Sequence, residues 1–266
     1  MRKKNVLVII LTVLIFLSAA VLGVSTVYRV DDVTVNAPVV SEEAKAEARE
    51  LQNRLSAAYK KESTLFADDE TAKTIVAEFP YFRLVSFKKA YPDRLVVEVR
   101  EDAEVYAVAA NDEASSYYIL SANGTVLGIR AESKNRSDGM ANVLLTGLDV
   151  TGEKGGTLVG DESLSYLFAF TQAVFEKLGG IRRNITSVDI SRPASDVKQT
   201  MFTLTTYEGV KLYVRNPAEN TAEKAEKAMD AYLSLSDRER LTGMVVVWDG
   251  TDGVKTQYSG RDVPIE

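Results

Sequence analysis

Residues 82–100 read FRLVSFKKAYPDRLVVEVR, and this stretch decides the fold of the first part of the chain. Apolar and polar residues alternate on both sides of Tyr91-Pro92-Asp93, as they do in strands that bury one face. A proline and an aspartate between two such runs are typical of a tight turn. We therefore predict a hairpin of two strands, Phe82 to Lys89 and Arg94 to Arg100.

Two helices are predicted immediately before this hairpin. Ser41 can cap a helix that extends to about Tyr59, in which alanines and leucines recur at three- and four-residue spacing. Asp68 or Asp69 can cap a second helix. Between the two helices, Leu65-Phe66 stands as an isolated apolar pair.

A short alternating strand at residues 30–35 precedes the helices and completes the predicted unit. The order is then strand, helix, helix, strand, strand. Helices packed on one face of a small sheet make a compact α+β domain. We place this domain at residues 29–101.

The chain begins with an apolar segment long enough to cross a membrane. Val6 to Val27 carries no charge, and at about 1.5 Å per residue it spans roughly 33 Å, against a hydrocarbon core of about 30 Å. The basic residues 2–4 predict a cytoplasmic tip at residues 1–5 and an extracytoplasmic location for everything after the anchor, residues 6–28. A cleaved signal peptide is the alternative, because residues 18–20 are small. Apolar character continues to Tyr28, which favours a retained anchor.

Residues 102–266 are predicted to form a second, mixed α/β domain with a mainly antiparallel sheet. Asn123-Gly124 is a typical hairpin turn. A helix with an apolar face is expected from Asp161 to Leu178, and a later helix from Asn216 to about Leu235. The predicted strands are Tyr117 to Leu120, Val126 to Ile129, Val143 to Thr146, Ile185 to Ile190, Met201 to Thr206, Val210 to Val214, Val245 to Trp248 and Val254 to Tyr258.

Composition excludes several kinds of function. The net charge is −6, and because Arg2, Lys3 and Lys4 contribute +3, the rest of the chain carries −9. An acidic surface of this kind does not favour nucleic acid. Histidine and cysteine are both absent, which removes the commonest general base, the usual zinc ligands and any disulfide. We expect no catalytic residue, no cofactor, no metal and no small-molecule substrate.

The motifs of the first domain resemble those of the FtsQ/DivIB family of bacterial division proteins. They are Leu65-Phe66, the aromatic-proline pair Phe79-Pro80, the turn Tyr91-Pro92-Asp93-Arg94-Leu95 and the strand Val97-Glu98-Val99-Arg100-Glu101. The order of elements behind a single anchor is similar to that of a POTRA (polypeptide-transport-associated) module. The resemblance extends, with weaker motifs, to the last strand.

This resemblance implies a non-enzymatic scaffold at the division septum that links early and late septal components. It implies partners of the FtsB/DivIC and FtsL type, which are small single-span coiled-coil proteins. By position in the family, the partner site is the last strand, Val254, Lys255, Thr256, Gln257 and Tyr258, with Tyr258 as the expected anchor. A terminal strand leaves one sheet edge to which a partner strand can be added.

Three alternatives remain open from the sequence. Tyr81, Phe82 and Tyr91 form either a second protein-contact surface or the cover of the small hydrophobic core. The chain is alternatively a POTRA-containing secretion or membrane-assembly factor, although only one such module is visible. It is alternatively a wall-polymer hydrolase with paired carboxylates, for which the candidates are Glu98 with Glu101 and Asp249 with Asp252.

Overall fold

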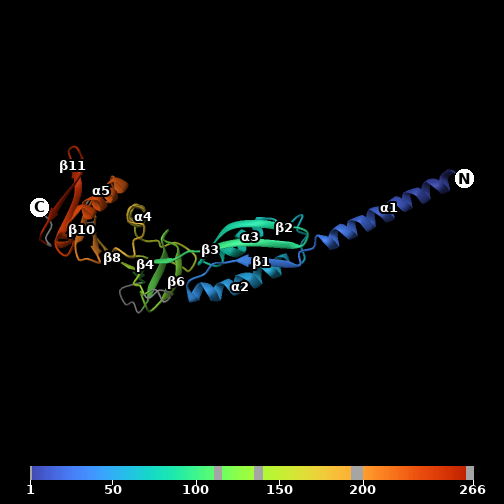
Figure 1. Ribbon diagram of the computed structural model, residues 1–266, viewed down its shortest axis with the longest axis horizontal. Coiled ribbons are helices and arrows are strands. Elements are labelled where there is room, and N and C mark those ends of the chain that lie inside the picture. Colours follow the sequence, from blue (N-terminus) through green and yellow to red (C-terminus); the bar gives the residue numbers. More distant parts are fainter. Residues whose placement is uncertain (1, 111–115, 135–139, 193–199, 262–266) are drawn as a thin grey trace. The chain divides into compact units, whose positions relative to one another are not determined.

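The computed structural model describes residues 2–110, 116–134, 140–192 and 200–261. The chain divides into two compact units, Met1–Glu101 and Asp102–Glu266. The first contains a long apolar helix and a small α+β domain, and the second contains a large mixed sheet with helices (Figure 1).

The N-terminal helix α1 extends from Arg2 to Val27. Among the described residues it is the one helix that is long and apolar enough to cross a membrane. Its apolar side chains from Ile10 onward are exposed, apart from a residue whose side chain is not described. The helical hydrogen bonding continues one residue further, since the Tyr28 N–H donates to the Val24 carbonyl at 3.0 Å. The predicted membrane-spanning length and apolar character are confirmed.

The rest of the first unit has the predicted order of elements. The sheet order is β1-β3-β2, with β1 parallel and β2 antiparallel to β3. Ser41 caps α2, because its Oγ accepts the Ala44 N–H at 3.1 Å, and Asp68 caps α3. Leucines of α2 and β3 fill the core between the helices and the sheet. The bounds are β1 Asp32–Asn36, α2 Glu42–Tyr59, α3 Asp69–Ala77, β2 Phe82–Ala90 and β3 Arg94–Glu101.

The described residues of the second unit form a nine-stranded sheet in the order β12-β11-β10-β9-β8-β7-β4-β5-β6. Five of the eight pairings are antiparallel and three are parallel, so in the described residues the sheet is mixed. The strands are β4 Glu104–Ala109, β5 Tyr117–Ser121, β6 Val126–Arg130, β7 Val143–Thr146, β8 Ile185–Ser191, β9 Met201–Thr206, β10 Lys211–Arg215, β11 Met244–Gly250 and β12 Gly253–Ser259. The helices are α4 Leu164–Leu178, α5 Thr221–Ser234 and α6 Asp237–Arg240.

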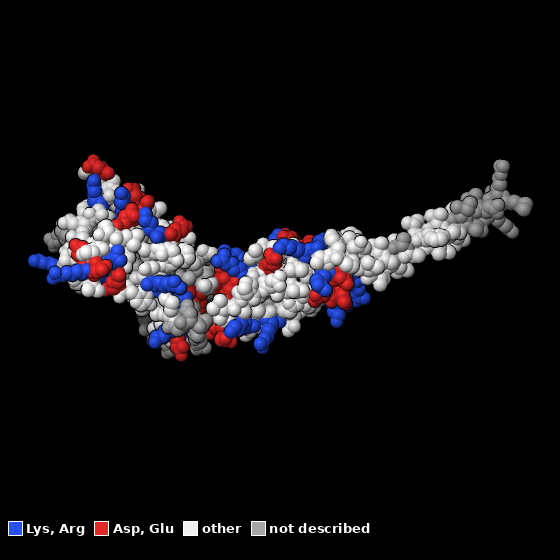
Figure 2. Space-filling view, in the orientation of Figure 1, with Lys and Arg blue, Asp and Glu red and all other residues white. Residues whose placement is uncertain are grey.

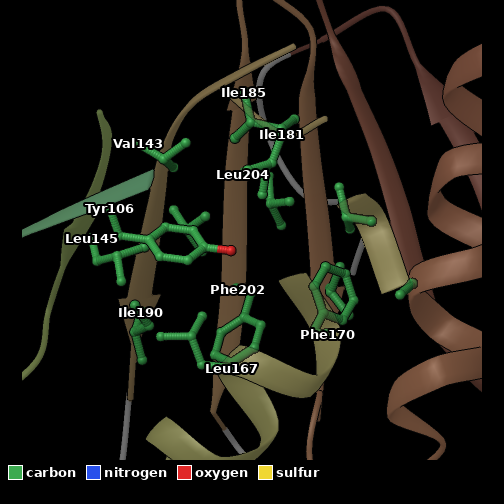
Figure 3. Packing of buried hydrophobic residues seen from close by; sticks show 14 of the residues in the cluster. Tyr106, Val143, Leu145, Leu167, Phe170, Ile181, Ile185, Ile190, Phe202 and Leu204 are labelled. Atoms are coloured by element: carbon green, nitrogen blue, oxygen red, sulfur yellow. The ribbon is translucent and has the colours of Figure 1, made fainter. Parts of the chain in front are cut away.

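One apolar core joins α4 to the middle of this sheet (Figure 3). Phe170 of α4 and Phe202 of β9 are fully buried and meet edge to face, with ring centroids 5.8 Å apart. Tyr106 of β4 is 1% exposed, and its burial raises the pKa of the phenol to about 12. The sheet is thus held along its length by a continuous apolar layer, which supports both edges.

Two predicted helix starts and one strand differ from the structure. The helix expected from Asp161 begins only at Leu164. The helix expected from Asn216 begins only at Thr221, because Asn216 and Asn220 both take positive φ angles, 47° and 52°, which interrupt a helix. Strand β4, Glu104–Ala109, was not predicted; only two residues separate it from the end of β3. Without β4 the central order of the sheet is not evident from the sequence.

Candidate functional site

Strand β12 lies at one end of the strand order in the large sheet. It pairs antiparallel with β11 over its whole length, from Gly253 opposite Gly250 to Ser259 opposite Met244. On its other side, no strand of the described residues pairs with it. In an edge strand, alternate residues direct their N–H and carbonyl groups away from the sheet. A row of main-chain donors and acceptors is therefore presented along β12.

The side chains of β12 divide into buried and exposed ones. Val254 is 8% exposed and belongs to the core, whereas Lys255, Thr256 and Gln257 are exposed. Tyr258 is half-buried, and its hydroxyl donates to the Thr242 carbonyl at 3.1 Å. The phenol of Tyr258 therefore holds the end of β12 against the preceding loop. The central three side chains remain for contact with another molecule.

A buried lysine fixes α5 to the hairpin that ends in β12. Lys224 is 0% exposed, and its Nζ donates to Asp249 Oδ2 at 2.5 Å and to the Asn216 carbonyl at 2.6 Å. Asn220 Nδ2 also donates to Asp249, at 3.0 Å. Burial alone would raise the pKa of Asp249, but the hydrogen bonds from Lys224 and Asn220 outweigh it and hold this pKa below its ordinary value. The edge strand is thus supported by a preformed ionic contact in addition to apolar packing.

The first carboxylate pair proposed for hydrolysis is engaged within the first unit. Glu98 accepts hydrogen bonds from Lys88 Nζ at 2.7 Å and Ser86 Oγ at 2.6 Å, and these lower the pKa of its carboxyl group. Glu101 accepts the backbone N–H groups of residues 40 and 41, at 2.5 and 3.1 Å. Since the two glutamates are three residues apart on one strand, their side chains point to opposite faces of the sheet. They do not converge on a common substrate position.

The two carboxylates of the second pair, Asp249 and Asp252, have different surroundings in the β11–β12 hairpin. Asp249 faces Lys224, as described above, while Asp252 lies in the turn between β11 and β12.

The three aromatic residues Tyr81, Phe82 and Tyr91 differ in their exposure. Tyr81 and Phe82 are 4% and 6% exposed and lie in the core, as the core interpretation predicts, whereas Tyr91 is 58% exposed in the turn after β2.

No protein-family model matches this chain, and no curated protein matches it.

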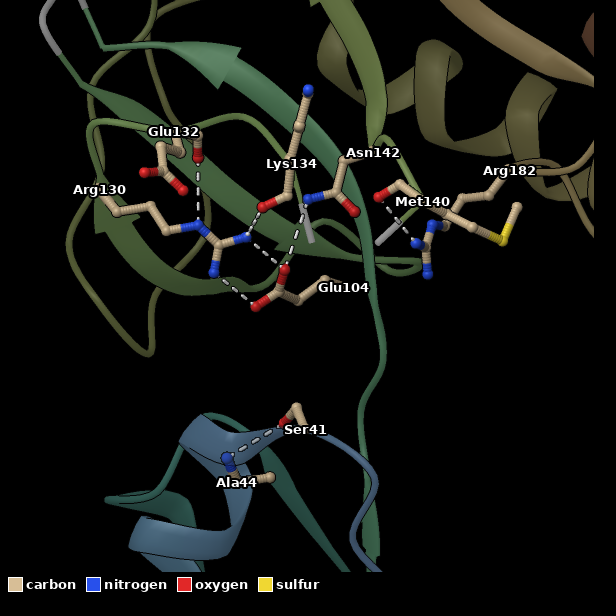
Figure 4. Close-up of polar contacts among 9 residues, drawn as sticks. All are labelled: Ser41, Ala44, Glu104, Arg130, Glu132, Lys134, Met140, Asn142 and Arg182. Carbon is tan, nitrogen blue, oxygen red and sulfur yellow. Dashed lines mark hydrogen bonds and ion pairs between the residues drawn. The ribbon is translucent and has the colours of Figure 1, made fainter. Parts of the chain in front are cut away.

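Charged side chains of both signs are interspersed on the visible face of the second unit (Figure 2). A largely buried ion pair between described residues of the second unit joins β4 to β6 (Figure 4). Glu104 accepts hydrogen bonds from Nη1 and Nη2 of Arg130, at 2.8 and 2.6 Å, and its side chain is 1% exposed. Asn142 donates to the same carboxylate at 3.4 Å. This bidentate contact joins the strands on either side of β5, at the sheet end opposite β12. Neither this pair nor the burial of Lys224 was predicted from the sequence.

Proposed function

We propose that this chain is a non-enzymatic scaffold of the bacterial division complex, of the FtsQ/DivIB kind. It is anchored by α1 with its N-terminus in the cytoplasm, and its two units lie outside the cytoplasm at the septum. It binds small single-span division proteins of the FtsB/DivIC and FtsL type and links early to late septal components. The observation that carries this proposal is the edge strand β12 at the end of the large sheet, whose outer side is paired with no strand of the described residues.

The first unit supports the same proposal. The order β1-α2-α3-β2-β3 directly behind an apolar helix is the order expected of a POTRA module. Two of the motifs behind the resemblance have structural roles there. Tyr91-Pro92-Asp93 forms the β2–β3 turn, and Glu101 accepts the N–H groups that precede α2. These roles explain why such residues occur in this pattern.

The proposed mode of binding is strand addition along β12. A partner segment in extended conformation donates to and accepts from the outward main-chain groups, which gives affinity. Specificity then comes from the exposed side chains Lys255, Thr256 and Gln257, which alternate between the two faces of the sheet. Tyr258 contributes indirectly, because its hydroxyl bond to Thr242 fixes the position of the strand end.

Two neighbouring proline substitutions test this mode and control for each other. In an antiparallel edge strand, one of two consecutive residues directs its N–H toward β11 and the other directs it outward. Thr256→Pro and Gln257→Pro therefore each remove one backbone N–H. One of the two substitutions removes a hydrogen bond to β11, and the other removes an N–H that would donate to the partner strand. The assay is binding of residues 30–266 to the purified extracytoplasmic part of the FtsB/DivIC-type protein from the same organism, together with thermal unfolding of each variant.

We expect one variant to keep its melting temperature and to bind about fivefold or more weakly, because it loses one main-chain hydrogen bond of about 1 kcal/mol and carries a blocking ring. The other variant should unfold at a lower temperature. If the variant with unchanged stability binds normally, strand addition at β12 is wrong. If the wild-type protein binds no partner of this class, the scaffold proposal itself is wrong.

A further inference from the structure

A turn between α2 and α3 displays two apolar side chains that the core of the first unit does not use. Phe66 is 84% exposed and Leu65 is 37% exposed, whereas the flanking Thr64 and Ala67 are buried. The N–H groups of Phe66 and Ala67 both donate to the Ser63 carbonyl, at 3.0 and 2.8 Å. This tight turn directs the two large side chains outward. Leu65 and Phe66 thus form an exposed apolar pair, which gains significance where it continues into further apolar surface.

The same turn is joined to the end of the anchor by backbone contacts. The Thr64 N–H donates to the Tyr28 carbonyl at 2.7 Å, and Arg29 forms an antiparallel bridge with Ser63. Thr64 Oγ1 also bonds the carbonyls of Tyr28 and Pro92. The apolar turn is therefore fixed within one or two residues of the point where the apolar helix ends.

The exposed side chains also lie beside the outer turns of α1. Leu65 and Phe66 line one hollow together with Leu17, Val21 and Val24 of the helix. Val21 lies six residues before the end of α1, a distance of about 9 Å along the helix axis. Apolar side chains of interfacial segments reach about 5–10 Å into the boundary between headgroups and acyl chains. The part of the hollow at Val24 and Val21 lies at the corresponding depth, and Leu17 lies deeper along the helix.

Two tyrosines and nearby basic residues complete this end of the first unit. The rings of Tyr28 and Tyr91 meet edge to face with centroids 6.1 Å apart, and Tyr91 is 58% exposed. Lys60 and Lys61 are exposed at the end of α2. Aromatic side chains that combine an apolar ring with a polar tip are enriched at membrane interfaces, and lysines there favour anionic headgroups.

We propose that Tyr28, Leu65, Phe66 and Tyr91 form a membrane-contact surface that inserts into the interface of the bilayer spanned by α1. This inference rests on the membrane anchoring in the proposed function. The occupant is phospholipid, because the surface continues from the end of the apolar helix and shares a hollow with it. The surface holds the first unit against the membrane in a fixed orientation.

The absence of cysteine makes a direct test available. In the full chain, Phe66→Cys carries one environment-sensitive nitrobenzoxadiazole dye. Val85→Cys is the matched control, because Val85 is also apolar and 61% exposed but lies in β2, about 20 Å along the strand from Tyr91. Both proteins are placed in phosphatidylcholine–phosphatidylglycerol nanodiscs with and without a spin-labelled lipid that quenches the dye within the acyl region.

We expect the dye at residue 66 to be shifted to the blue and quenched several-fold more by the spin-labelled lipid than the dye at residue 85. A second measurement places the dye on Tyr91→Cys. There, Phe66→Ser should reduce the ratio of inserted to free domain by about tenfold, because burying a phenylalanine side chain is worth at least about 1.5 kcal/mol.

The same measurements distinguish failure of the proposed contact surface from failure of the membrane anchor. Equal quenching at residues 66 and 85 in protein that co-elutes with nanodiscs overturns the contact surface but leaves the anchor in place. Shielding of residue 66 from aqueous iodide without quenching by the spin-labelled lipid means that protein covers it, such as a second copy, and also overturns the proposal. Failure to co-elute with nanodiscs overturns the anchor and this inference together.

Discussion

Replacing Glu104 with alanine should be one of the most damaging single changes in the second unit. The carboxylate is 1% exposed and accepts two guanidinium hydrogen bonds from Arg130, which is itself 13% exposed. Truncation leaves a nearly buried positive charge without its partner, a change that typically costs 3–5 kcal/mol. Arg130 keeps the carbonyls of Glu132 and Lys134 as acceptors, at 3.1 and 2.7 Å. We therefore expect a loss near the lower limit, about 3 kcal/mol, or about 6–12 °C in melting temperature for a unit of this size.

The assay is urea and thermal unfolding of residues 30–266 followed by the fluorescence of Trp248. This is the only tryptophan of the chain and lies in β11, so it reports on the second unit. Asp230→Ala is the matched control. Its ion pair with Lys177 has a similar length, 2.8 Å, but side chains that are 36% and 51% exposed, and its loss should cost less than about 1 kcal/mol.

A double replacement separates the ion pair from simple packing. Replacing Glu104 and Arg130 together with methionine removes the charge and keeps most of the volume, so it should cost less than Glu104→Ala alone. The reasoning would be refuted by a Glu104→Ala cost below about 1 kcal/mol, or by a double variant as unstable as the sum of the single ones.

Three further predictions concern stability. Gly147→Ala should destabilise the second unit by about 2 kcal/mol or more. The reason is that Gly147 has a φ of 77° and an added Cβ would lie 1.9 Å from the Ile190 carbonyl oxygen. Thermal unfolding measures this loss, and an unchanged melting temperature would contradict the prediction. Ser41→Ala should cost the first unit about 1 kcal/mol in urea unfolding, whereas Ser41→Asp, which keeps a capping oxygen, should cost much less. The folded-state pKa of Asp249 is lowered, so its contribution to stability is present above its ordinary pKa of 3.8 and is lost as pH falls through the folded value. Asp249→Asn should therefore reduce the loss of stability below about pH 4 in acid titrations, and an unaltered acid limb would argue against the Lys224 contact.

The elements of the first unit were predictable because their signals are local. Ser41 and Asp68 are capping residues that precede apolar periodicity, and the structure uses both as caps. Tyr91-Pro92-Asp93 separates two alternating runs and forms the turn between β2 and β3. In the second unit, Asn123-Gly124 likewise stands at the turn between β5 and β6, where Gly124 takes a φ of 80°. In each case a few neighbouring residues determine the conformation.

The rest depends on contacts between residues far apart in the sequence. Lys224 and Glu104 carry charged side chains that are normally exposed, so nothing in their neighbourhood predicts burial. Their partners, Asp249 and Arg130, are 25 and 26 residues away. The exposure of Phe66 is also hidden in the sequence, because an apolar residue between two helices usually joins the core.

In the proposed membrane-anchored state, the contact between Thr64 and Tyr28 has a consequence for how this chain meets a partner in the same bilayer. A flexible linker of about ten residues has a root-mean-square end-to-end distance of about 17 Å, so a domain on such a linker would take many orientations relative to its anchor. Here the Tyr28 carbonyl and the Val30 N–H are both hydrogen-bonded to the α2–α3 connection. No free linker therefore separates α1 from the α+β domain that follows it. A partner diffusing in the same bilayer would then meet the α+β domain in a narrow range of orientations relative to the membrane. The orientational part of the search for a partner is shortened before contact begins, which favours rapid association.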